Sequence, residues 1–198
     1  MKSIIFNQHQ VNHALNNEEG MFRVVVKPYP WQVVINADFK KGNNIPKYGH
    51  DEREIKPKFE VGETIFVKEA YDIWDDKILF KADATKQLRY LECKWKSPIH
   101  MKEEHSRLTL RIKSVKVERL QDISEEDCWK EGIDTSSDYA DYAVRQAVKE
   151  GKSEVGARDY FREYWNSTHK KSEEKWEANP WVFVYECGEG LGNLLIFC

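Results

Sequence analysis

The order of hydrophobic and polar positions predicts a short helix near the amino end of the chain. Val11, Ala14 and Leu15 recur at helical spacing within a polar stretch. We expect the helix to end near Asn16 and Asn17, because asparagine tolerates the left-handed conformation that often closes a helix. The chain is therefore expected to begin with one short amphipathic helix.

A series of short strands is predicted around and after this helix. The segments are rich in β-branched and aromatic residues, and they cover residues 22–28, 31–37, 61–71, 77–83, 88–95 and 107–120. Pro28 and Pro30 separate the first two segments, so neither is expected to be central in a sheet at those positions. The polar stretch 38–59 contains several glycines and prolines, and we interpret it as a surface loop.

The strand predicted at 107–120 carries an irregularity. Its apolar residues alternate in two phases, with Leu108, Leu110 and Ile112 in one phase and Val115 and Val117 in the other. Because successive side chains face opposite sides of a strand, the change of phase predicts one extra residue, a β-bulge, near Lys113 or Ser114. A long strand that bends at a bulge suits a small closed barrel.

The carboxyl half is expected to be helical before it ends in another strand. Ser124 can cap a short helix, with Asp127 at the capping-box position and Gly132 as a left-handed residue at the helix end. Amphipathic helices separated by glycines follow and predict a helical insertion at about 134–171. The segment NPWVFVYEC predicts a last strand, and residues 188–198 form a glycine-spaced apolar tail.

Composition narrows the class of protein. With 40% hydrophobic and 33% charged residues over 198 positions, the chain is typical of one globular domain that carries an insertion. Its net charge of −3 argues against coating nucleic acid or membrane through bulk charge, although a local basic cleft is compatible with it. The sequence shows neither a signal peptide nor an apolar run of about 18 residues, so we expect a cytoplasmic protein without a membrane partner. The four cysteines lie far apart, which favours free thiols.

Four stretches of the chain carry a family resemblance. They are LQDISEED followed by EGI, VGETIFVKEAY, WKSPIHM and NPWVFVYE. Over about residues 3–187 the chain resembles the ASCH-domain family, particularly its longer phage-encoded members. The resemblance implies an α+β fold, namely a small PUA-like, antiparallel-rich β-barrel with flanking helices. This fold would form a single domain over residues 1–187. The resemblance also implies a cleft beside the first helix. Some characterised relatives cleave the acetyl amide of N4-acetylcytidine, and others are thought to bind RNA.

The resemblance is lost at the family's motif Gly-x-Lys-x-x-Thr-x-Arg. In that motif the lysine can take the proton of the threonine hydroxyl, which then attacks an amide. The four motif positions fall on Asn17, Glu19, Phe22 and Val24. Residues 4–26 contain no Lys, Ser, Thr, Cys or Tyr that could replace them, whereas Glu131 matches the family's catalytic glutamate.

Polar residues near the expected barrel mouth are candidates for ligand contacts. Lys68 and Glu69 close an apolar strand, and one of them is expected to point into the mouth because strand neighbours face opposite sides. His100 could bond a base edge or be structural. Arg23 lies beside the changed motif. Glu131 is unfavourable for the helix dipole at a carboxyl end, which favours a role in the cleft, with a solvated glutamate as the alternative.

Trp95 lies between Lys94 and Lys96. An aromatic face beside two cations would suit a nucleotide, with the ring stacking on a base and the lysines contacting the nucleic-acid backbone. The alternative is a barrel aromatic with snorkelling lysines. His9 and His13 have metal-ligand spacing, but no third ligand is identifiable, so we expect neither a metal nor another cofactor.

Function is interpreted from these sites. The leading hypothesis is an RNA- or nucleoside-binding ASCH module that does not use the family's Lys/Thr/Glu mechanism. One alternative is an amidohydrolase acting on a modified nucleoside, with water activated by Glu131 or with a replacement group such as Thr64 or Lys68. Another is a phage protein that binds a host protein through the helical insertion.

Overall fold

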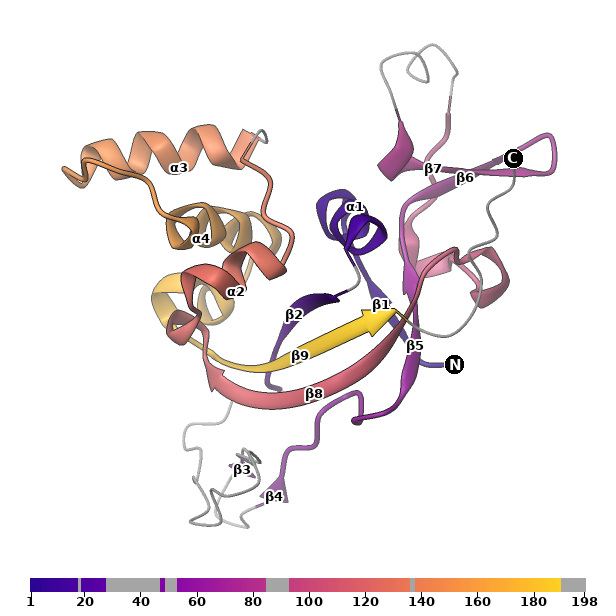
Figure 1. The fold of residues 1–198 in the computed structure, drawn as a ribbon, viewed down its shortest axis with the longest axis horizontal. Helices are drawn as coiled ribbons and strands as arrows, with labels where there is room; N and C mark the ends of the chain where they lie inside the picture. Colours follow the sequence, from indigo (N-terminus) through magenta and orange to yellow (C-terminus); the bar gives the residue numbers. More distant parts are fainter. Residues whose placement is uncertain (18, 28–46, 49–52, 85–92, 136–137, 190–198) are drawn as a thin grey trace.

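The computed structural model describes residues 1–17, 19–27, 47–48, 53–84, 93–135 and 138–189. Its main element is a five-stranded sheet in the order β1-β5-β8-β9-β2 (Figure 1). The strands are β1 (Ser3–Ile5), β2 (Glu19–Val25), β5 (Thr64–Lys68), β8 (Thr109–Arg119) and β9 (Trp181–Glu189). β1 and β5 are parallel, and the other pairs are antiparallel.

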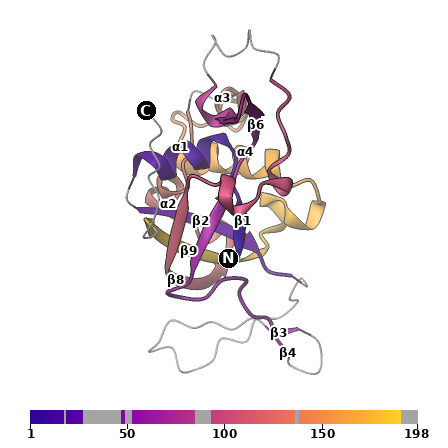
Figure 2. The same ribbon diagram turned by 90° about the vertical axis from the view of Figure 1, so that its right-hand side faces the viewer.

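This architecture is a mixed α+β fold, but not a closed barrel over the described part of the chain. β1 and β2 are the two edges of the sheet there and do not pair with each other. Short β3 (Lys47–Tyr48) and β4 (Arg53–Glu54) form one separate ribbon, and β6 (Tyr71–Trp74) and β7 (Lys77–Phe80) form another. The β3–β4 ribbon lies at the opposite end of the molecule from α3 and β6 (Figure 2).

The helices lie beside this sheet. They are α1 (Gln8–Asn16), α2 (Glu125–Lys130), α3 (Asp138–Lys149) and α4 (Ala157–Thr168). Short 3₁₀ segments cover 81–83, 98–100, 103–105, 120–122, 172–174 and 176–178. Figure 1 shows α1 between the group α2 to α4 and the strands β5 to β7. Among the described residues, no helix combines the length and apolar character needed to cross a membrane.

The first helix ends where it was expected to end, but by a different mechanism. Asn7 and Gln10 form a capping box at its start. Asn17 follows the helix in an extended conformation (φ −132°), not a left-handed one. Its side-chain amide donates to the carbonyl oxygen of His13 at 2.7 Å, so asparagine satisfies a free helix carbonyl through its side chain.

The β-bulge in β8 is confirmed. Ile112 pairs with Cys187 and Ser114 pairs with Glu186, so Lys113 is the extra residue. The short helix α2 is confirmed as well. Ser124 accepts a hydrogen bond from the Asp127 backbone at 3.0 Å, and the left-handed Gly132 follows the helix.

Alternating residues of β2 and β9 supply two apolar clusters. One contains Phe22 and Tyr185 and includes Val11 of α1. The other contains Val182 and Val184 and is covered by apolar residues of α2 and α4. The predicted helices of the insertion are therefore confirmed, and α4 belongs to the packing of the sheet.

The interpretation of residues 38–59 as a surface loop is wrong at its carboxyl end. Ile55 and Phe59 are buried in the first cluster, and the Phe59 ring packs edge-on against Tyr185. The Lys58 amide also donates to the Tyr185 hydroxyl at 3.0 Å. Two apolar residues were enough to bring the carboxyl end of this stretch into the core, and residues 38–46 and 49–52 lie outside the described part of the chain.

Some predicted elements lie outside the described residues. These are the strand at 31–37, most of the strand at 88–95 and the tail beyond residue 189. Residues 188 and 189, which were assigned to the tail, belong to β9. Trp95 is not in a strand, and Lys96 forms an isolated bridge with Tyr71.

The turn after α2 packs tightly against α1, and a pair of glycine variants tests this contact. Gly132 and Gly151 have φ of 75° and 73°, so alanine costs about 1–2 kcal/mol of backbone strain at either position. Only at Gly132 would the new Cβ lie 2.7 Å from the Cβ of His13. Gly132→Ala is therefore expected to lower the free energy of unfolding by about 1–3 kcal/mol more than Gly151→Ala does in urea denaturation. Equal losses would contradict the close packing of α1 on this turn.

Candidate functional site

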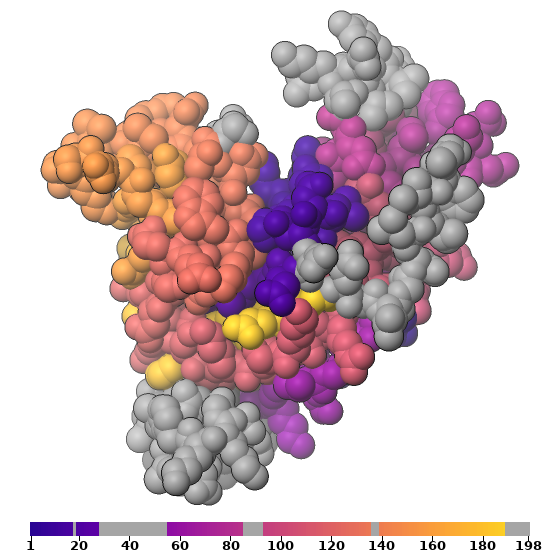
Figure 3. Space-filling view, viewed as in Figure 1, coloured from indigo at the N-terminus to yellow at the C-terminus, as the bar shows by residue number. Residues whose placement is uncertain are grey.

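A cleft of about 450 Å³ lies where β1 runs into α1. This volume falls within the range of small-molecule sites in proteins. Its lining residues come from the β1–α1 junction, the β5–β6 connection, the 3₁₀ segments 81–83 and 98–100, and the helices α3 and α4: Ile5, Phe6, Asn7, Gln8, His9, Glu69, Ala70, Lys81, Ala82, Pro98, Tyr139, Tyr164, Ser167 and Thr168. The space-filling view shows a hollow between the α3 side and the β6–β7 side, with α1 at its floor (Figure 3).

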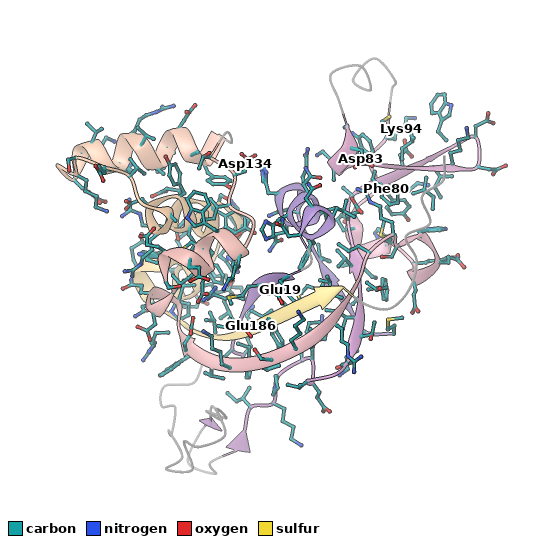
Figure 4. The ribbon with its side chains drawn as sticks, in the orientation of Figure 1. Glu19, Phe80, Asp83, Lys94, Asp134 and Glu186 are labelled. Carbon is teal, nitrogen blue, oxygen red and sulfur yellow. The ribbon has the colours of Figure 1, made fainter. Side chains whose placement is uncertain are left out.

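Glu69 supplies a buried carboxylate to one wall of the cleft. Only 3% of the residue is exposed, and Arg107 donates to both of its oxygens, at 2.8 and 3.0 Å. Burial raises the pKa of Glu69, and the Arg107 guanidinium offsets this only in part. Arg107 also donates to Asp83 at 2.7 Å and stacks over the Phe80 ring. Figure 4 shows Asp83 and Phe80 on the same side of the molecule, beside β6 and β7. The carboxylate is therefore fixed in place and keeps further lone pairs for a ligand.

The opposite wall combines aromatic rings with hydroxyl groups. The rings of Tyr139 and Tyr164 have their centroids 5.5 Å apart. Asn7 donates to the Tyr164 hydroxyl at 2.9 Å, and burial raises the pKa of this phenol. The hydroxyls of Ser167 and Thr168 donate to carbonyls within α4, so their lone pairs can accept hydrogen bonds from a ligand.

His9 lies on the same cleft and contacts a carboxylate. Its Nδ1 lies 3.0 Å from Oδ2 of Asp134, and its ring meets the Tyr139 ring edge-on. His13, one turn later, contacts Asn17. Over the part of the chain that is described, no three His, Cys, Asp or Glu side chains are grouped as metal ligands.

Arg23 and Glu131 form a buried ion pair away from this cleft. The Arg23 side chain is fully buried and donates to Glu131 and, at 2.7 Å, to Glu118, with Asp127 at 3.6 Å. Burial opposes the charge of Arg23, but these carboxylates outweigh it and raise the pKa of the guanidinium. Burial raises the pKa of Glu131 to about 7, although the charge of Arg23 acts in the opposite direction.

This ion pair corrects the interpretation of Glu131. Glu131 is only 3% exposed, so the alternative of a solvated glutamate is wrong. It lines a separate cavity of about 20 Å³ with Gln10, His13 and Cys187, which is space for a water molecule. The unfavourable position of an acid at the end of α2 is compensated by Arg23. The structure therefore does not bring Glu131 and Glu69 into one site.

Four of the remaining predicted residues lie in the segment 94–100, which contacts β6. The Lys94 amide donates to Asp72 at 2.9 Å, and the Lys96 ammonium lies over the Tyr71 ring at 5.8 Å. Trp95 is half-buried, and Lys94, Lys96 and His100 are exposed. None of these four residues lines the cleft, but Pro98 in the same segment does.

Lys68 and Thr64 lie away from the cleft lining. The Lys68 ammonium donates to the Ile99 carbonyl at 3.1 Å, and Thr64 pairs with Arg111 along β5 and β8. Sequence reasoning missed Arg107, because nothing in its neighbourhood indicates that it meets Glu69. Tyr139 and Tyr164 were visible only as helix-face aromatics.

Comparisons of the chain with profiles of known protein families, with curated proteins and with solved structures found no match. The candidate site is therefore argued from its own geometry.

The buried position of Glu131 predicts a pH dependence of stability. Because its folded pKa of about 7 lies above the usual 4.5, its ionisation costs the folded state free energy as the pH rises between these values. Between pH 4.5 and 8 the free energy of unfolding of the native protein is expected to fall by about 3 kcal/mol relative to that of Glu131→Gln, because glutamine does not titrate. Urea unfolding at several pH values measures this difference.

Glu126→Gln is the matched control, since Glu126 is an exposed glutamate of the same helix. The free energy of unfolding of this variant is expected to change with pH in parallel with that of the native protein. If the Glu131→Gln curve is parallel as well, Glu131 does not carry the raised pKa.

Proposed function

We propose that this protein is a binding module that holds a nucleobase, free as a nucleoside or within RNA, in the cleft between Glu69 and α4. The observation that carries the proposal is the buried carboxylate of Glu69, fixed by Arg107 beside a cleft of nucleoside-compatible size. Carboxylates accept hydrogen bonds from the amino and imino groups of base edges. Tyr139 and Tyr164 supply aromatic surface on the facing wall, and unpaired bases are commonly bound against such rings.

The sequence motifs support the same proposal. LQDISEED with EGI, VGETIFVKEAY, WKSPIHM and NPWVFVYE are the residues on which the ASCH resemblance rests. We include in the proposal that the sheet and its helices are a PUA-like fold of that family, with its ligand cleft beside the first helix. The position of the cleft against α1 is compatible with that expectation.

The family's Lys/Thr/Glu mechanism has no support in the geometry. Glu19, at the lysine position, is exposed and pairs with Lys113 at 2.6 Å. Phe22, at the threonine position, is buried in the core and stacks on Tyr185. Glu131 is engaged by Arg23 outside the cleft. The proposal therefore assigns binding to the cleft without this mechanism.

A substitution that blocks the cleft tests the proposal. Ala82 lines the cleft, whereas Ala84, two residues later, does not. Calorimetric titration with cytidine, N4-acetylcytidine, uridine, adenosine, guanosine and a short single-stranded RNA is expected to find binding by at least one of them. Ala82→Phe is expected to abolish that binding and Ala84→Phe to preserve it. Glu69→Gln is expected to weaken it about 10- to 150-fold, the loss of a charged hydrogen bond.

The result that contradicts the proposal is equally direct. It is wrong if none of these compounds binds at millimolar concentration, or if Ala82→Phe and Ala84→Phe bind equally well. A thermal melt of each variant separates loss of binding from loss of folding.

If RNA is the ligand, the segment around Trp95 extends the site. Trp95→Ala is expected to remove a stacking contact of about 1–3 kcal/mol, a loss of roughly 5- to 150-fold in affinity. Lys94→Ala and Lys96→Ala are each expected to reduce the salt dependence of binding, by up to about 0.7 in log–log slope. Fluorescence anisotropy over a salt series measures both effects. Lys149→Ala, on α3, is the control expected to keep the native slope. If Lys94→Ala and Lys96→Ala keep the native slope, as Lys149→Ala does, the RNA backbone contacts the protein elsewhere.

A further inference from the structure

β1 is an edge strand with one open side. Over the described part of the chain it pairs only with β5, with Ile5 opposite Lys68 (Figure 1). The Phe6 amide donates to the Lys68 carbonyl at 3.0 Å. Because alternate residues of a parallel strand bond to the same neighbour, Ser3 and Ile5 direct their amides and carbonyls to the open side. Such groups form a template for pairing with another extended chain.

Three of these four backbone groups are free. The amide of Ser3 and both the amide and the carbonyl of Ile5 have no hydrogen-bond partner among the described residues. The Ser3 carbonyl accepts a hydrogen bond from the Lys58 ammonium at 2.8 Å, which is a side-chain contact and not a strand pairing. The backbone of this edge is therefore available to a partner.

Lysines give the same edge an excess of positive charge. Lys58 reaches Ser3, the Lys2 ammonium donates to the Lys58 carbonyl at 3.0 Å, and Lys68 faces the strand from β5. Lys2 pairs with Glu63 at 3.0 Å, but in the part of the chain that is described neither Lys58 nor Lys68 has a carboxylate within ion-pair distance. Burial and the charges of Lys68 and Lys2 lower the pKa of Lys58, so these ammonium groups repel one another.

Exposed aliphatic side chains lie beside these charges. Ile5 is 51% exposed and Ile99 is 62% exposed. Lys68 lies next to both, because it is opposite Ile5 in the ladder and donates to the Ile99 carbonyl at 3.1 Å. The edge thus combines free backbone groups, apolar surface and unbalanced cations.

We propose that the open side of β1 binds an extended acidic segment of another protein, which adds a strand to the sheet at Ser3–Ile5. Acidic side chains of the segment pair with Lys58 and Lys68, and an apolar side chain between them covers Ile5. The inference goes beyond the proposed function and does not rest on it. Ile5 borders the nucleobase cleft, but Ser3 and the two lysines do not line it.

A peptide matches this edge better than a nucleic acid does. Amides and carbonyls alternate along an extended peptide, so they pair with both the amide and the carbonyl of Ile5. Phosphate groups carry acceptors only and leave that carbonyl without a partner. The exposed apolar neighbours, Ile5 and Ile99, are aliphatic, whereas unpaired bases stack on aromatic rings.

Two labelled peptides of equal charge test the proposal by fluorescence anisotropy. The native protein is expected to bind the peptide EVEIEVE, whose glutamates alternate with apolar residues. The peptide EVEPEVE is expected to bind at least about tenfold more weakly, because its central proline lacks the amide that a strand pairing requires. Attraction by charge alone would give the two peptides the same affinity.

Charge reversal tests the lysines. Lys58→Glu and Lys68→Glu are each expected to weaken binding of EVEIEVE about 2- to 30-fold, because each replaces an exposed attraction by a repulsion. Lys77→Glu is the matched control, since Lys77 is an exposed residue of β7, and it is expected to keep the native affinity. Thermal melts show whether each variant is folded.

The backbone pairing is tested at Ile5. Ile5→Pro removes the amide on the open side and leaves the bonds between β1 and β5, so it is expected to weaken binding of EVEIEVE at least about fivefold. Hydrogen exchange of the Ile5 amide in the native protein needs no variant. It is expected to slow when EVEIEVE is bound and to stay unchanged with EVEPEVE.

Each outcome decides for or against the proposal. Binding of EVEIEVE that depends on Lys58 and Lys68 and slows exchange at Ile5 supports it. It is wrong if EVEIEVE does not bind at millimolar concentration, if both peptides bind equally, or if the lysine variants behave like Lys77→Glu. The lysines would then only keep the edge unpaired. Lysine-dependent binding of a short oligouridine without peptide binding would assign the edge to nucleic acid. None of these results depends on whether cytidine binds in the cleft.

Discussion

The burial of Arg23 is the constraint on which the arrangement around the cleft depends. Its guanidinium is inaccessible to solvent between β2 and the helices, and an unpaired charge in that position would be very costly. Glu118 of β8 and Glu131 at the end of α2 neutralise it, with Asp127 nearby. The position of α2 over the sheet therefore follows from an electrostatic requirement as well as from apolar packing.

The same ion pair fixes the turn that leads to the cleft. Glu131 is followed by Gly132, whose left-handed conformation and missing side chain let the turn approach His13 of α1 closely. Two residues later Asp134 reaches His9 at the rim of the cleft. The buried Arg23–Glu131 ion pair on one side of α1 thus determines that Asp134 meets His9 on the other side of the helix. The small cavity at Glu131 and the larger cleft remain separate sites.

Local signals in the sequence predicted much of the fold. The phase change around Lys113 is contained within one strand, and the cap at Ser124 lies within one turn, so both could be recognised without knowledge of the tertiary structure. The site depends on long-range contacts instead. Arg23 meets Glu131 across 108 positions, and Glu69 meets Arg107 across 38. A single sequence shows which residues carry charge, but the partner of each charge is decided by the packing of the sheet and helices.

The location of the ligand site is tested most directly by NMR. Amide spectra of the native protein, titrated with cytidine and with N4-acetylcytidine, report which part of the chain each compound contacts. The account predicts that the largest shifts occur at residues lining the cleft, such as Gln8, Ala70, Ala82 and Thr168. Shifts that collect instead around the exposed Tyr142 and Val148 of α3, or no shifts at millimolar ligand, would contradict it.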